Sequence, residues 1–120
     1  MATANTPNNT LHDRAVGAAI RFLERKYWHD IERINCAPFD IVARDGETVV
    51  FVHVKAETNG SFPDEPTRAD YERGMIAYML DNPGAIEPDC AARIDTVTMI
   101  VVGDDRALLR HHVNAARFDR

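Results

Sequence analysis

The chain has 120 residues, of which 45% are hydrophobic and 28% are charged, and its formal net charge is −5. These values are ordinary for a single globular domain. The acidic balance counts against tight non-specific nucleic-acid binding, so any DNA contact must depend on a local patch. An uninterrupted apolar run of 18 residues is absent, which excludes a membrane-spanning helix and predicts a soluble, cytoplasmic protein without a membrane partner.

The first 35 residues predict a tail, a helix and a possible strand. Residues 1–10 are small and polar, and we expect a disordered tail in which Thr10 or Asp13 caps the helix that follows. Apolar residues recur at helical spacing over Leu11–Tyr27 and predict the first helix. A possible edge strand over Trp28–Asn35 comes next.

The next stretch predicts a β-hairpin. Two runs rich in Val, Ile and Phe, Phe39–Arg44 and Glu47–Lys55, flank Asp45-Gly46, and Asp-Gly between such runs is the strongest short-range hairpin signal. If Asp45-Gly46 is a two-residue loop, Asp40 lies opposite Phe51.

Side chains alternate between the two faces of a strand. One face of this hairpin is apolar in the middle and polar at one end. Asp40, His53 and Lys55 are expected together at the polar end of this face. The other face is nearly all apolar and is expected to lie on the core; it carries Phe39, Ile41, Ala43, Thr48, Val50, Val52 and Val54.

The second half predicts a loop, a helix and two strands. Ala56–Pro66 is rich in turn-forming and acidic residues and is expected to be a loop. Thr67–Asn82 predicts a helix with Thr67 as N-cap and Asp70 completing a capping box. Ile94–Val102 predicts a strongly apolar strand, and Ala107–Val113 a final strand after a turn at residues 103–105.

This order of elements predicts an α/β sandwich with a mixed central sheet. We expect one domain over residues 11–116 and a short tail over 117–120. Cys36 and Cys90 show no CxxC spacing, so the sequence carries no zinc motif, and both are expected to be buried free thiols in a reducing cytoplasm.

The two runs of the hairpin also carry a family resemblance. Phe39-Asp40-Ile41-Val42-Ala43 and Phe51-Val52-His53-Val54-Lys55 resemble the core of PD-(D/E)xK nucleases, and more narrowly the YraN-like family of predicted bacterial endonucleases, which are related to archaeal Holliday-junction resolvases. Arg93-Ile94-Asp95-Thr96-Val97 and Asn114-Ala115-Ala116 resemble later segments of that family. The resemblance covers roughly Leu11 to Ala116 and implies a restriction-endonuclease-like fold and an endonuclease acting on branched or structured DNA.

The resemblance assigns the catalytic residues Asp40, His53 and Lys55 and the metal ligands Asp40 and His53, with Mg²⁺ or Mn²⁺ as the divalent metal. It also exposes departures from the family pattern. His53 stands in place of a metal-binding Glu, Pro38 in place of another Glu, and Ala15-Val16 in place of the first-helix Gly-Glu.

Three outcomes therefore remain open for the site. In the first, the site is inactive and the chain retains only the fold. In the second, Asp40 and His53 hold a softer metal. In the third, His53 acts as a general base. The first outcome defines the alternative function, a catalytically inactive nuclease-fold domain for nucleic-acid or protein interaction. The sequence leaves the oligomeric state open, including a homodimer.

Overall fold

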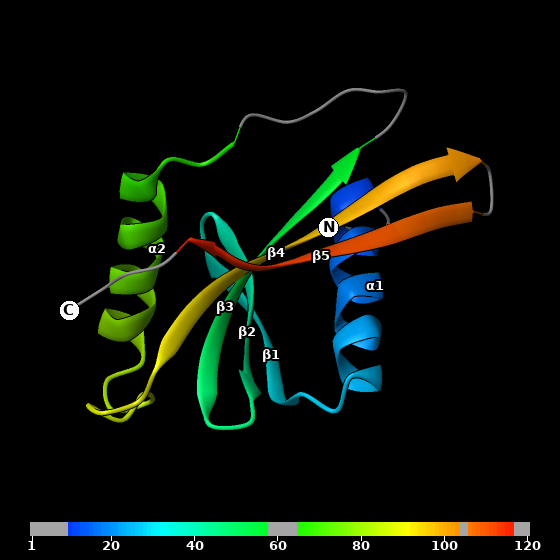
Figure 1. Ribbon diagram of the computed structural model, residues 1–120. Helices are drawn as coiled ribbons and strands as arrows, with labels where there is room; N and C mark the ends of the chain where they lie inside the picture. The colour runs from blue at the N-terminus through cyan, green and yellow to red at the C-terminus, as the bar shows by residue number, and fades with distance from the viewer. Residues whose placement is uncertain (1–9, 58–64, 104–105, 117–120) are drawn as a thin grey trace, which may run out of the picture.

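The computed structural model describes residues 10–57, 65–103 and 106–116. They form two helices and five strands (Figure 1): α1 (Leu11–Arg25), β1 (His29–Cys36), β2 (Phe39–Asp45), β3 (Thr48–Glu57), α2 (Arg68–Asp81), β4 (Ala92–Gly103) and β5 (Arg106–Ala116). The predicted tails, except Thr10, and most of the predicted loops after β3 and β4 lie outside the described residues.

The strands make one sheet in the order β1-β2-β3-β4-β5. β3 and β4 pair in parallel, and the other three neighbouring pairs are antiparallel. A parallel pair needs a crossover connection, and α2 lies in that connection between β3 and β4. The predicted α/β class with a mixed central sheet is confirmed.

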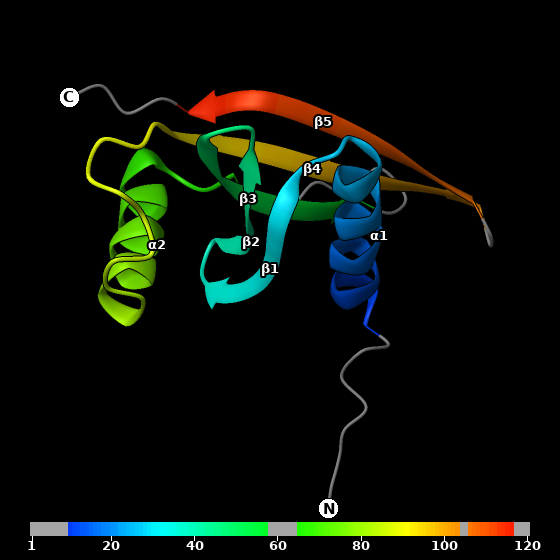
Figure 2. The same cartoon turned by 90° about the horizontal axis from the view of Figure 1, so that it is seen from below.

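The two helices cover opposite faces of the sheet, as Figure 2 shows. Each face has its own hydrophobic core. The core beneath α1 includes Leu23, Ile41, Val50, Val52, Val54 and Val97. The core beneath α2 includes Phe39, Val49, Phe51, Tyr71, Tyr78 and Ile94. Each face of the β2–β3 hairpin packs against one helix, and both faces are accordingly apolar in the middle. No helix in the described part of the chain is long and apolar enough to cross a membrane.

Both helices begin at the predicted caps. The Thr10 hydroxyl accepts a hydrogen bond from the Asp13 amide at 3.0 Å, and Thr67 and Asp70 form a reciprocal capping box at α2. The predicted end of the first helix at Tyr27 is wrong by two residues, because Tyr27 adopts a φ of 65°, a left-handed conformation that a right-handed helix cannot contain.

The β2–β3 hairpin forms with a register shifted from the predicted one. Asp45 pairs with Thr48 and Val42 with Phe51, so the loop is Gly46-Glu47 and the predicted pairing of Asp40 with Phe51 is wrong. Gly46 has a φ of 63°, and positive φ at the first loop residue alone is the pattern of a type II′ turn rather than type I′. Each residue of β2 pairs two residues further along β3 than predicted. Because side chains alternate with a period of two, the predicted assignment of side chains to faces is still correct from Ile41 onward.

At the start of β2 the predicted faces are exchanged. Phe39 packs against Phe51 and Tyr71, with ring centroids 5.3 and 5.5 Å apart, and so lies on the α2 side. Asp40 instead contacts α1 through His12. Alternation fails here because the regular ladder with β3 begins at Ile41, and register shifts also interrupt the β1–β2 pairing.

A buried charge cluster joins the hairpin to β4 and β5. Asp95 is 0% exposed. Arg93 donates to both of its carboxylate oxygens at 2.9 Å and also reaches Asp45 at 3.1 Å. The Nε2 atom of His111 lies 2.9 Å from the same carboxylate. A buried carboxylate is tolerated only when it is paired in this way, so the cluster ties the tip of β2 to β4 and β5.

Candidate functional site

Asp40 stands at the start of β2, between β3 and α1. Its Oδ2 atom accepts a hydrogen bond from the backbone N–H of Val54 at 3.0 Å. Its Oδ1 atom lies 2.7 Å from Nε2 of His12 in α1. The Asp40 side chain is 18% exposed and that of His12 is 52% exposed. The carboxylate is thus held in a fixed orientation, while its imidazole partner can be reached from solvent.

His53 lies in the middle of β3 and faces α2. Its Nδ1 atom is 2.9 Å from the carbonyl oxygen of Pro38. A carbonyl can only accept a hydrogen bond, so Nδ1 carries the proton and Nε2 of the neutral ring carries a lone pair. The ring also makes an edge contact with Tyr71, with centroids 6.4 Å apart.

The charge state of His53 follows from its burial. Desolvation lowers the pKa of His53 below its ordinary value, and the Pro38 carbonyl and the charge of Asp40 raise it by less, while Lys55 lowers it further. At neutral pH the ring is therefore neutral and offers Nε2 as a ligand or a proton acceptor. The same balance shows that Asp40 and Lys55 both lie within electrostatic range of the ring.

Lys55 follows His53 by two residues on the same strand. Its side chain is 13% exposed, and its ammonium group is paired with Glu65. A phosphate group that approached Lys55 would compete with this carboxylate. The predicted site residues are therefore gathered in one region, but Asp40 contacts α1 whereas His53 contacts α2, so the prediction that all three share one face is wrong.

His12 is a candidate site residue that sequence reasoning missed. The resemblance assigned the lost first-helix carboxylate to Ala15-Val16, and both of those residues are 0% exposed in the core. His12 precedes Val16 by four residues and so lies one turn away on the same helix face. This spacing is the sequence feature that could have identified His12. The polar side chain beside Asp40 comes from one turn before the position at which the family has its carboxylate.

The donor atoms set a limit on metal binding. In the described part of the chain, no group of three or more His, Cys, Asp or Glu side chains is placed to hold a metal ion. Magnesium is commonly bound through one or two carboxylates together with substrate phosphates, and imidazole suits manganese. The Asp40 carboxylate and a nearby imidazole can supply two ligands to a divalent ion that a bound phosphate also coordinates. The described side chains do not form a complete set of protein ligands for such an ion.

Fold and site together define a class of protein: a mixed α/β sheet between two helices, with a fixed carboxylate beside imidazoles at one end of a hairpin. Comparison with known proteins adds a family. The chain is 41% identical over 105 residues to a UPF0102 protein of Geobacter metallireducens, an alignment that covers 78% of this chain and 86% of the relative.

Two further relatives agree. A UPF0102 protein of Geobacter sulfurreducens is 31% identical over 116 residues, covering 90% of this chain and 89% of that protein. A UPF0102 protein of Streptomyces griseus is 33% identical over 89 residues, covering 70% of each chain. A search of protein-family models found no match. The chain belongs to the UPF0102 family.

Proposed function

We propose that this UPF0102 protein is an endonuclease-like protein that binds nucleic acid and hydrolyses DNA phosphodiesters at Asp40, His53 and Lys55. The observation that carries the proposal is the Asp40 carboxylate, which the Val54 amide orients and which lies within electrostatic range of a neutral His53. The resemblance of this hairpin to the PD-(D/E)xK core supports the same chemistry.

Each residue has a distinct part in the proposed reaction. Asp40 and His53 lie on opposite faces of the hairpin, so the His53 ring would have to turn toward Asp40 for the two to hold one divalent ion, manganese or magnesium. Such an ion would polarise the phosphate and lower the pKa of the attacking water. Lys55 leaves Glu65 and offsets the negative charge that develops on the phosphate oxygens. His53, neutral with a free Nε2, is also suited to accept the proton of the water as a general base.

A second candidate function rests on the contacts that the same residues already make within the chain. Asp40 is already paired with His12 and Lys55 with Glu65, so both charged groups of the site have partners without a substrate. This arrangement favours a catalytically inactive nuclease-fold domain that binds nucleic acid or a protein.

Cleavage of labelled branched and single-stranded DNA, with Mg²⁺ or Mn²⁺, tests the first candidate. We expect stronger cleavage with Mn²⁺, because an imidazole replaces an oxygen donor at His53. Asp40→Asn should abolish cleavage, and Lys55→Met should slow it by about 100-fold or more. His53→Glu should raise the Mg²⁺-dependent rate. His112→Gln is the matched control, since His112 is an exposed histidine of β5 outside the site.

The same preparations separate the two candidates. If wild type and His53→Glu are both inert with every metal but bind the DNA in a gel-shift assay, the inactive-domain function replaces the nuclease. If they neither cleave nor bind DNA, the nucleic-acid function is rejected altogether.

A further inference from the structure

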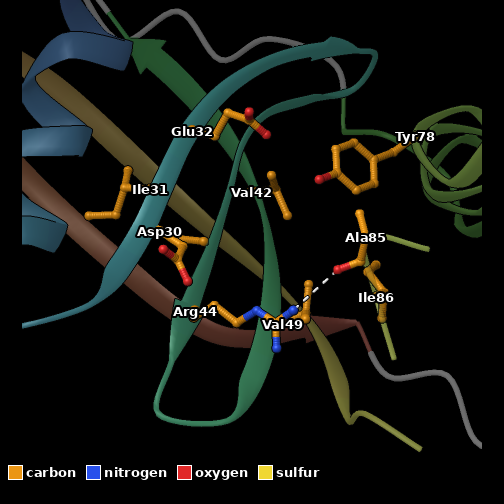
Figure 3. Close-up of a pocket in the computed structure, with 10 residues that line it drawn as sticks. Asp30, Ile31, Glu32, Val42, Arg44, Val49, Tyr78, Ala85 and Ile86 are labelled. Atoms are coloured by element: carbon orange, nitrogen blue, oxygen red, sulfur yellow. Dashed lines mark hydrogen bonds between the residues drawn. The ribbon is translucent and has the colours of Figure 1, made fainter. Parts of the chain in front are cut away.

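A groove that none of the predicted site residues lines runs between β1 and the C-terminal half of α2 (Figure 3). One cavity in it, with a volume of about 420 Å³, is lined by Glu32, Val42, Arg44, Tyr78 and Ile86, among others. A second hollow of about 410 Å³ shares Glu32 and Tyr78 with the first and extends the groove to Asp81. Volumes of this size are typical of small-molecule sites.

Tyr78 is the unexplained group in this groove. The residue is 7% exposed, and Figure 3 shows its hydroxyl directed from α2 toward the strands, on the side where Val42 and Glu32 lie. Among the residues that the structure describes, the hydroxyl has no hydrogen-bond partner. Buried polar groups are nearly always hydrogen-bonded, so an orphan hydroxyl at a cavity wall points to a partner that the chain itself does not supply.

The charges around Tyr78 indicate that a partner in this groove would be positively charged. Glu32 projects from β1 and Asp81 is the last residue of α2, and within the described ranges neither carboxylate has an ion-pair partner. The last turn of α2 contains no basic residue, so the negative end of the helix dipole adds to the same field. Burial raises the pKa of Tyr78, the charges of Glu32 and Cys36 raise it further, and the charge of Arg44 lowers it by less. Glu32 and Tyr78 line both hollows of the groove.

The two arginines that line the groove do not cancel this field. Arg44 donates from Nη2 to Glu87 at 3.0 Å and to the Ala85 carbonyl at 3.2 Å. Arg33, at the other end, is paired with Asp13 of α1. Each arginine is thus neutralised by an acid outside the region between Glu32 and Asp81, and the groove retains a net negative charge at its centre.

We propose that this groove binds a small organic cation, whose ammonium or guanidinium group lies between Glu32, Asp81 and Tyr78. Its N–H groups would donate to the two carboxylates and to the Tyr78 hydroxyl, and the face of the phenol ring would attract the cation. The apolar wall of Val42 and Ile86 would contact its carbon chain. This site is separate from the proposed nuclease site, and neither depends on the other.

The test is an NMR titration of the full-length protein with four-carbon probes that differ only in their end groups. Agmatine and putrescine carry cations, 1,4-butanediol is neutral and succinate is anionic. We expect the two amines to shift the backbone amides of Glu32, Tyr78 and Asp81, and the shifts to weaken in high salt. Equal shifts with butanediol or succinate, or no shifts at all, would overturn the proposal.

Variants assign the binding to individual groups. Glu32→Gln and Asp81→Asn should each weaken amine binding by about threefold to tenfold. Glu24→Gln, which removes an exposed carboxylate from α1, should leave it unchanged. An amine dissociation constant that stays the same in both groove variants would refute the assigned site.

Tyr78→Phe gives a signature that a merely structural tyrosine would not give. Removal of an orphan buried hydroxyl should leave the free protein as stable as before or more stable, and yet it should weaken amine binding by about twofold to fivefold. If Tyr78→Phe destabilises the free protein and leaves the affinity unchanged, the hydroxyl serves the fold and the proposal is wrong about it.

Discussion

Gly74→Ala should destabilise the protein, although alanine is the better helix former. Gly74 lies in α2 where the helix meets the connection between β1 and β2. A Cβ atom at this position would lie 2.8 Å from the carbonyl oxygen of Ala37, 2.9 Å from Cδ2 of Phe39 and 3.0 Å from the carbonyl oxygen of Cys36. Two of these atoms belong to the backbone and cannot rotate away, so the helix must shift away from the sheet.

The expected magnitude is the difference of two effects. Alanine gains about 1 kcal/mol over glycine in a helix interior. Overpacking a close contact typically costs about 1–3 kcal/mol, and the upper part of that range applies here because two of the three opposing atoms are backbone carbonyl oxygens. The net loss of unfolding free energy is therefore about 1–2 kcal/mol, which corresponds to a fall of roughly 0.5–1 M in the urea midpoint for a small domain.

Gly17→Ala provides the matched control. Gly17 lies in α1, and the nearest atom to its Cβ would be Nη1 of Arg21 at 3.6 Å, the mobile end of an exposed side chain. Here only the gain in helix propensity remains, so Gly17→Ala should raise the unfolding free energy by about 0.5–1 kcal/mol. If urea denaturation shows both substitutions stabilising the protein alike, the close packing of α2 on the β1–β2 connection is refuted.

Three further predictions follow from the buried groups. The pKa of His53 is lowered by burial from an ordinary value of 6.5, so the stability that depends on its neutral ring is fully present above pH 6.5 and is lost as the pH falls through the folded-state pKa. His53→Gln should flatten the fall of the urea midpoint below pH 6.5, and an unchanged slope would contradict the shift. Asp95→Asn should cost about 3–5 kcal/mol in urea denaturation, because it removes the buried carboxylate that Arg93 and His111 share and leaves Arg93 only the half-exposed Asp45. A loss below about 1 kcal/mol would show that the cluster contributes little. Val52→Ala should cost about 1–3 kcal/mol through lost burial and a residual cavity, and an unchanged midpoint would reject its place in the core.

Local rules explain why most elements could be predicted from the chain alone. Thr10 and Thr67 cap helices because their hydroxyls satisfy amides three residues later, a relation contained within one turn. Alternation places Val50, Val52 and Val54 together beneath α1 because neighbouring side chains of a strand point to opposite faces. The hairpin register was less secure, because Asp45-Gly46 and Gly46-Glu47 both put the glycine in the loop.

Tertiary structure alone decided the contacts between elements that are distant in the sequence. The four-residue spacing to Val16 places His12 on that face of α1, but the contact between His12 and Asp40, which lies 28 residues further on, depends on how α1 packs against β2. The break in alternation at the start of β2 depends on how β1 and β3 pair with it, so no local pattern announced it.

The groove at Tyr78 follows the same logic. Helical spacing assigns Tyr78 to the buried stripe of α2, but whether its hydroxyl meets a partner depends on where β1 places Glu32. The sequence by itself determined the class of fold and the residues available for chemistry, because spacing and capping act over a few residues. Which of those residues face one another was decided by the packing of α1 and α2 on the sheet, since distances between elements depend on the whole core.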